Sequence, residues 1–313
     1  MKPVLLATEL WGVQISVPTY GVLVTLGMAL AIVLVVRQGK RQGLPAEALL
    51  DLSWWLLIAG LAGSRLFYVV QNAGDYWQLC SGSGAPRSTG AWLHDCAAPL
   101  RLWDGGLVFY GGAICAAAVA LRFGRKRAWS FPLLGDLFAP ALTAGHAVGR
   151  LGCFAAGCCY GKTCAPDSWL GVHFPPGSVA HERLLEAHPS ADPAAVTPAL
   201  FPTQLFESAA LVLLFALLLF WRRRQKYTGQ LFLLYLAGYA VVRFLVEIYR
   251  GDGVRRFVVE LPWPALARAL GLPPAEPLFL STSQAVSLVL LAAAVITAHL
   301  RGRETARPVA ATP

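Results

Sequence analysis

Charged residues are scarce in this sequence of 313 residues: they make up 14% of it, whereas 56% of the residues are hydrophobic. The mean hydropathy is +0.55. Because an ordinary soluble domain has about 25% charged residues, this composition excludes the soluble class. Crossing the ~30 Å hydrocarbon core of a bilayer takes about 20 mostly apolar residues, so the length allows several such helices. We expect an all-α polytopic membrane protein with about seven transmembrane helices.

Three further features are missing. The first apolar run, from Tyr20, has no small-residue cleavage site after it, which favours a retained helix over a removed signal peptide. The apolar runs show no tandem repeat, which argues against a duplicated transporter. The cysteines form no CxxC pair, which weakens redox and zinc interpretations.

Acidic residues are fewer than basic ones, 17 against 26, giving a formal charge of +9. The basic residues gather at the ends of apolar runs and form no stripe along a soluble face, so we expect no nucleic acid partner. By the positive-inside rule, the ends of the apolar runs that carry these basic residues face the cytoplasm. This orientation predicts a periplasmic N-terminus and a cytoplasmic C-terminus. The clusters are Arg37, Lys40 and Arg41; Arg122, Arg125, Lys126 and Arg127; Arg222, Arg223, Arg224 and Lys226; and Arg301, Arg303 and Arg307.

Seven apolar runs define the predicted spans, near residues 19–36, 47–70, 105–121, 133–150, 204–221, 229–249 and 284–300. We expect one transmembrane domain over residues 1–313, with periplasmic loops near 71–104, 151–203 and 251–282. The loop cysteines Cys80 and Cys96 are the simplest disulfide pair in an oxidising periplasm, although sequence cannot fix connectivity. The alternative is that the cysteines are small buried apolar residues.

An ionisable group near the bilayer centre costs at least ~2.5 kcal/mol, so such residues are candidates for function. In the sixth run, five polar residues recur every three or four positions and share one helix face: Tyr235, Tyr239, Arg243, Glu247 and Arg250. Arg243 and Glu247 can pair at i, i+4, leaving guanidinium donors for a phosphate. The alternative is an ion pair between helices without a substrate.

The fourth run ends with His146 and Arg150, again at i, i+4, among several glycines. The alternatives are a snorkelling arginine and a packed neutral histidine. Gln204 and Glu207 open the fifth run, where the alternative is a proline-led helix start with an acid in its first turn. Two more ionisable residues, Asp136 and Arg65, could pair anywhere in the bundle.

Four segments, LWDGGLVFYGG, GRLGCFAAGCCYGK, FPTQLFES and GYAVVRFLVEIYRGD, resemble the prolipoprotein diacylglyceryl transferase family in order and separation. Weaker matches are PTYGVLVTLG, GSRLFYVV and STSQAVSLVLL. The resemblance implies seven helices in the bacterial inner membrane. It also implies an enzyme that moves a diacylglyceryl group from phosphatidylglycerol to the lipobox cysteine of a preprolipoprotein signal peptide. No cofactor and no metal are implied; the partners are these two substrates and membrane lipids.

The resemblance also implies the site. Its catalytic residues would be Arg150 and Arg243. We hypothesise that His146, one turn before Arg150, or Tyr110 supplies the base. The substrate-binding residues that we expect are Arg150, Tyr20, Gln204, Glu207, Tyr239, Glu247 and Arg65. Guanidinium groups suit this chemistry because they stay charged and bind phosphate oxygens in pairs.

The sequence departs from the family pattern at its centre. Tyr110 stands where relatives have a histidine, Cys153 where they have asparagine, and Cys158 where they have glutamate. Phe201 replaces the histidine of a His-Pro-x-Gln motif, and Lys162 stands for arginine. Two alternatives therefore stay open: a paralogue that binds an anionic lipid or lipoprotein without catalysis, and a membrane thiol or metal protein that uses the cysteines from Cys153 to Cys164.

Overall fold

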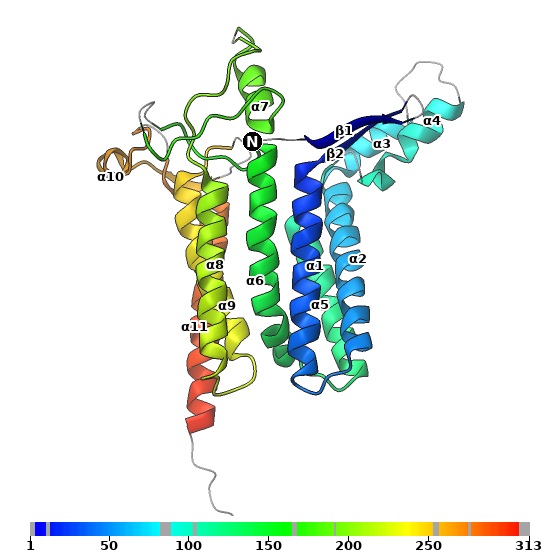
Figure 1. Ribbon diagram of the computed structural model, residues 1–313, viewed down its shortest axis with the longest axis vertical. Coiled ribbons are helices and arrows are strands. Elements are labelled where there is room, and N and C mark those ends of the chain that lie inside the picture. Colours follow the sequence, from blue (N-terminus) through cyan, green and yellow to red (C-terminus); the bar gives the residue numbers. More distant parts are fainter. Residues whose placement is uncertain are drawn as a thin grey trace, which may run out of the picture. The chain divides into compact units, whose positions relative to one another are not determined.

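The computed structural model describes residues 4–10, 13–81, 89–102, 105–164, 168–190, 192–252, 257–274 and 277–306. Trp103 and Asp104 of the LWDGG segment, and Arg307 of the last basic cluster, lie outside the described residues. The described chain is mostly helical, with two small two-stranded antiparallel sheets. Figure 1 shows the arrangement of the helices. The long helices are α1 (Thr19–Lys40), α2 (Ala46–Gln71), α5 (Phe109–Lys126), α6 (Phe131–Ala156), α8 (Thr203–Arg222), α9 (Gln230–Tyr249) and α11 (Thr282–Ala306).

The shorter elements lie between the long helices or at the N-terminus. The helices among them are α3 (Ala73–Ser81), α4 (Thr89–Cys96), the 3₁₀ turn η1 (Ala98–Leu100), α7 (Val179–Ala187) and α10 (Pro264–Ala269). The two sheets pair β1 (Val4–Leu10) with β2 (Val13–Pro18), and β3 (Phe257–Leu261) with β4 (Phe279–Ser281).

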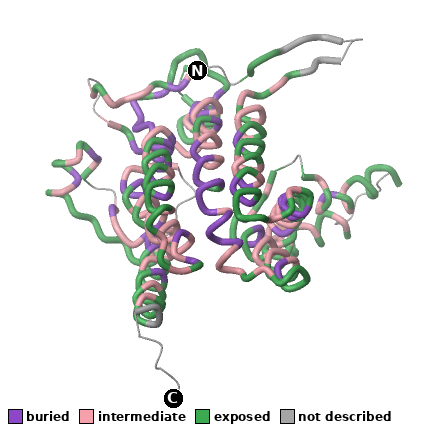
Figure 2. Tube along the Cα trace, turned by 60° about the horizontal axis from the view of Figure 1, so that its bottom comes forward, coloured by how far each residue is buried: buried purple, intermediate pink, exposed green. Residues whose placement is uncertain are grey.

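Each predicted span corresponds to one long helix, so the prediction of an all-α polytopic membrane protein is confirmed. Among the described residues, α1, α2, α8, α9 and α11 are long and apolar enough to cross a membrane. The other two are less apolar because α5 ends in a basic cluster and α6 contains Asp136, His146 and Arg150. Large apolar side chains are exposed on the long helices, among them Trp54 (60%), Leu213 (71%) and Val289 (68%) (Figure 2). Such faces suit lipid contact.

Several helix boundaries differ from the predicted ones, and two of the differences have clear local causes. The third span begins at Phe109, not at 105, because Gly105 and Gly106 adopt left-handed φ angles of +79° and +70° that a helix cannot contain. The fourth span continues to Ala156, six residues past Arg150, because no proline or left-handed glycine intervenes before Gly157, whose φ is +72°.

The chain divides into two compact units, each described by itself. The first, residues 36–134, is called the α2–α5 unit. In it α2 and α5 cross at small residues: a Cβ on Gly111 would lie 2.5 Å from the Gly63 carbonyl oxygen. The predicted disulfide between Cys80 of α3 and Cys96 of α4 is confirmed.

The second unit, residues 1–35 and 135–313, is called the α6–α11 unit. Here α9 packs against both α8 and α11. α1 and α6 approach at glycines, since a Cβ on Gly27 would lie 2.6 Å from the Gly145 carbonyl oxygen. A single domain over residues 1–313 stays a prediction.

Asp136 holds the start of α9. Its carboxylate accepts hydrogen bonds from the N–H groups of Gly229 (2.6 Å) and Phe232 (2.9 Å) and from the Gln225 amide. It thereby satisfies donors that a helix N-terminus leaves without partners inside the helix. Nearby, the Tyr227 hydroxyl donates to the Ala298 carbonyl at 3.4 Å, so the basic clusters after α8 and at the end of α11 share one end of the unit.

The predicted loops 151–203 and 251–282 contain packed structure. Phe201, Ile248 and Leu278 are at most 8% exposed and form an apolar core with residues of α10 and the segment after it. Backbone bridges join Gly161 to Arg250, and Leu200 to both Thr163 and Val172. This packing ties the segment before α8 to the end of α9.

Candidate functional site

An ion pair joins α6 to α8. Nη2 of Arg150 lies 2.9 Å from Oε1 of Glu207, and both side chains are largely buried, with exposed fractions of 14% and 2%. The sequence had indicated that Arg150 lies at the end of its helix. It lies inside the helix instead, because α6 continues to Ala156. The buried carboxylate compensates the arginine charge and offsets part of the cost of burying it.

Two more predicted residues meet the same carboxylate. Nε2 of His146 lies 3.6 Å from Oε1 of Glu207, and the Tyr239 hydroxyl donates to that oxygen at 3.5 Å. The rings of His146 and Tyr239 are 5.5 Å apart. Side chains from α6 and α9 therefore converge on Glu207 of α8.

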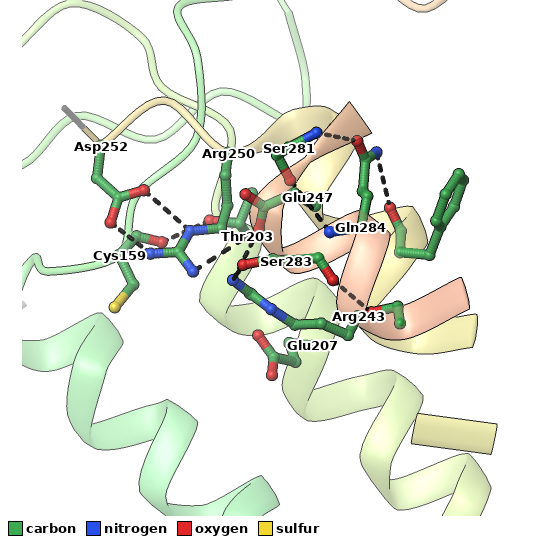
Figure 3. Close-up of polar contacts among 12 residues, drawn as sticks. Cys159, Thr203, Glu207, Arg243, Glu247, Arg250, Asp252, Ser281, Ser283 and Gln284 are labelled. Carbon is green, nitrogen blue, oxygen red and sulfur yellow. Dashed lines mark hydrogen bonds and ion pairs between the residues drawn. The ribbon is translucent and has the colours of Figure 1, made fainter. Parts of the chain in front are cut away.

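A second pair lies on α9. Nη2 of Arg243 is 2.7 Å from Oε2 of Glu247, as the i, i+4 spacing predicted, and donates to the Ser283 hydroxyl of α11 at 3.1 Å (Figure 3). Both Arg243 and Arg150 interact electrostatically with Tyr239. The two arginines thus belong to one polar cluster.

A third pair follows α9 and was not among the predicted site residues. Arg250 donates to Asp252, with Nε 2.9 Å from Oδ1, and its Nη1 lies 3.9 Å from Oε2 of Glu247 (Figure 3). Although burial acts to lower it, the hydrogen bonds and charge of Asp252 raise the pKa of the Arg250 guanidinium. The sequence had placed Arg250 on the same helix face as Glu247, three residues earlier.

The three arginines and three carboxylates sum to zero formal charge, yet the cluster retains donors. Nε of Arg150 and Nη1 of Arg243 are buried and have no hydrogen-bond partner among the described residues. A buried N–H without a partner is costly, and an anion is the group that would satisfy it. The cluster therefore has donors suited to an anion, although its own formal charge sums to zero.

Two other predicted residues border this cluster. Gln204 is 1% exposed, and its Nε2 donates to the Cys158 carbonyl at 2.7 Å. The amide nitrogen therefore ties the start of α8 to the segment after α6. Tyr20, 43% exposed, lies against Gly152, where a Cβ would be 3.4 Å from its ring, and interacts electrostatically with Arg150.

Comparison with known proteins decides the family. The sequence model of the family described as prolipoprotein diacylglyceryl transferase matches residues 7–300. The chain belongs to this family. A protein named phosphatidylglycerol--prolipoprotein diacylglyceryl transferase from Clostridium tetani is 30% identical over 253 residues, which cover 80% of this chain and 86% of the relative.

Two further relatives of the diacylglyceryl transferase family carry the same name. The protein from Lactiplantibacillus plantarum is 30% identical over 247 residues, covering 78% of each chain. The protein from Lactobacillus delbrueckii subsp. bulgaricus is 28% identical over 286 residues, covering 90% of this chain and 86% of the relative. The similarity therefore includes all the helices that carry the cluster.

Two positions that depart from the diacylglyceryl transferase pattern have packing roles. Phe201 is 3% exposed, and its ring lies 5.2 Å from that of Tyr249, so this side chain extends an apolar core. Lys162 is buried and donates to the Pro277 carbonyl at 3.0 Å.

Two predicted site residues of the diacylglyceryl transferase pattern belong to the α2–α5 unit. Arg65 is buried, and its nitrogens donate to the backbone carbonyls of Ala98 (2.7 Å), Pro99 (2.9 Å), Gly105 and Gly106 (3.2 Å). It thus fixes the segment between η1 and α5. Tyr110 lies in the first turn of α5 and is 49% exposed. Their parts in substrate binding and catalysis stay predictions.

Proposed function

We propose that this chain transfers the diacylglyceryl group of phosphatidylglycerol to the lipobox cysteine thiol of preprolipoproteins, the reaction in its relatives' names. The observation that carries the proposal is the pair of buried arginines, Arg150 and Arg243, each held by one carboxylate and each with a buried N–H left for an anion. Two guanidinium groups in one cluster suit a phosphodiester headgroup.

The reaction balances without a cofactor. The cysteine sulfur forms a bond to the glyceryl carbon that carries the phosphate, and the carbon–oxygen bond to phosphate breaks. The electron pair leaves with the oxygen, giving glycerol phosphate, and the thiol proton goes to a base. Negative charge gathers on the leaving phosphate, where Arg150 and Arg243 stabilise it more strongly than in the diester.

In this proposal His146 is the base, because it lies one turn before Arg150 and its Nε2 is 3.6 Å from the Glu207 carboxylate. Glu207 and Glu247 position the arginines. Gln204, Tyr20 and Tyr239 shape the binding region, while Arg65 acts by positioning the segment before α5.

We also propose that the protein lies in the bacterial inner membrane with its N-terminus in the periplasm and its C-terminus in the cytoplasm. The basic end of the α6–α11 unit would then face the cytoplasm. The cluster around Arg243 and Arg250 lies at the opposite ends of α8 and α9, on the side where exported preprolipoproteins arrive.

Complementation of a strain depleted of its own transferase tests the proposal. The unchanged chain should restore growth and produce lipid-modified lipoprotein, whereas Arg243→Ala should abolish rescue and reduce transfer in vitro by at least about 10²-fold. Arg223→Ala is the matched control, because Arg223 is exposed at the far end of α8. It should rescue as well as the unchanged chain.

Equal rescue by Arg243→Ala and the unchanged chain would overturn the proposal. Failure of the unchanged chain despite normal membrane insertion would also overturn it. Retained binding of phosphatidylglycerol in nanodiscs would then point to the non-catalytic paralogue.

A further inference from the structure

Three cysteine thiols meet where α6 ends. The Sγ atoms of Cys153, Cys158 and Cys159 all lie within 4.8 Å of one another, and each residue is half-buried. Cys164, the next cysteine, instead packs against the apolar core around Phe201. The polar cluster of arginines and carboxylates does not use these thiols.

The end of the helix explains how cysteines five residues apart come together. The N–H of Cys158 donates to the Cys153 carbonyl at 3.1 Å, and the N–H of Gly157 donates to the Phe154 carbonyl at 3.2 Å. With Gly157 in the left-handed conformation, these bonds form a Schellman motif. That motif places the first and last of its six residues side by side, which here are two cysteines.

The third thiol is held by a costly backbone conformation. Cys159 has a φ angle of +58°, a left-handed conformation that is strained for a residue other than glycine. Helix α8 maintains the turn: the Thr203 hydroxyl donates to the Cys159 carbonyl at 2.6 Å, and Gln204 donates to that of Cys158 at 2.7 Å. The arrangement of the thiols is therefore built into the fold before any ligand binds.

Positive charge lies beside the thiols. Arg150 and Arg250 both interact electrostatically with Cys159, and Figure 3 shows Cys159 next to the Arg250–Asp252 pair. Metal-binding cysteines act as thiolates, whose negative charge such guanidinium groups offset.

We propose that Cys153, Cys158 and Cys159 bind one thiophilic metal ion, Cu⁺, through three thiolate sulfurs. Soft thiolate ligands select Cu⁺, whereas a structural zinc site is almost always closed by four ligands. Three thiols also suit a site with three thiolate ligands, because a disulfide between two of them would leave the third sulfur unused. Each ligand that binds releases its thiol proton to solvent.

Copper titration of the full-length chain tests this site. Reduced protein in detergent would compete for Cu⁺ with a chromophoric chelator, and we expect one ion per chain. Cys158→Ser and Cys159→Ser should each weaken binding by at least roughly tenfold. Cys164→Ser and Cys115→Ser are the matched controls and should bind like the unchanged chain. Arg243→Ala should also bind copper, which separates this site from the proposed transferase.

Alkylation of the unchanged chain gives a second test that does not depend on folding of the variants. Cu⁺ should protect Cys153, Cys158 and Cys159 from alkylation, whereas Cys164 should react equally with and without it. Unprotected cluster cysteines, or equal copper affinity in Cys158→Ser, would overturn the proposal. So would a native disulfide within the cluster, seen as three instead of the five free thiols in the unreduced, denatured chain.

Discussion

Arg150 and Glu207 form a 2.9 Å ion pair between α6 and α8, and the Glu207 carboxylate that makes it is only 2% exposed. The same carboxylate oxygen also lies near His146 and accepts a hydrogen bond from Tyr239. The position of one buried oxygen therefore orients a guanidinium, an imidazole and a phenol at once. Changes at Glu207 should affect both the stability of the helix bundle and the proposed chemistry.

The first prediction concerns the strength of this pair. Arg150→Gln and Glu207→Gln should each lower the free energy of unfolding by about 3–5 kcal/mol, because each leaves the other charge buried and unpaired. The double variant should lose much less than the sum, since no uncompensated charge remains. Thermal unfolding in detergent measures all three.

The exposed pair Arg183–Glu186 is the matched control, with a similar 3.0 Å separation but exposed fractions of 61% and 65%. Its double-mutant cycle should give a coupling of about 0–1 kcal/mol because solvent screens it. Equal coupling in the two cycles would show that burial of the Arg150–Glu207 pair does not determine its strength.

The second prediction concerns the base. His146→Ala should lower the transfer rate by about 10²–10⁴-fold if the imidazole takes the thiol proton. Tyr110→Phe tests the other candidate, and His188→Ala is the control because His188 is an exposed histidine. Rates are measured with a lipobox peptide in vesicles of phosphatidylglycerol. Near-normal rates in both His146→Ala and Tyr110→Phe would contradict both assignments.

The third prediction concerns the crossing of α1 and α6. Gly145→Ala should lower the thermal unfolding midpoint, because the added Cβ would lie 2.7 Å from the Gly27 carbonyl oxygen. Gly149→Ala, one turn further along α6, would place its Cβ in open space and should be neutral or slightly stabilising. If the two variants unfold at the same temperature, close packing at Gly145 is not needed.

The fourth prediction concerns the start of α9. Asp136→Ala should destabilise the protein by about 1–2 kcal/mol, because it removes the acceptor of the Gly229 and Phe232 N–H groups. Asp51→Ala, which removes an exposed carboxylate of α2, is the control and should change stability little. Hydrogen exchange at Gly229 and Phe232 should accelerate only in Asp136→Ala. Unchanged exchange there would contradict this role.

Sequence reasoning located the helices well because apolar runs of about 20 residues have few alternatives in a membrane. It also found the Arg243–Glu247 pair, since i, i+4 neighbours on one helix meet by local geometry. The sequence placed Arg150 at a helix end, which was wrong. A sequence pattern does not distinguish Gly152, which lies within α6, from Gly157, which ends the helix.

What the sequence determined by itself was the membrane class, the helices and the arginines, because hydropathy and helical period are local properties. Only the tertiary structure decided what each charge meets. Glu207 faces Arg150 across two helices, Asp136 caps a helix about 90 residues away in the chain, and three cysteines without a CxxC pair converge at a helix end. Partners so distant in the chain are chosen by helix packing and by how each helix ends, which no local pattern records.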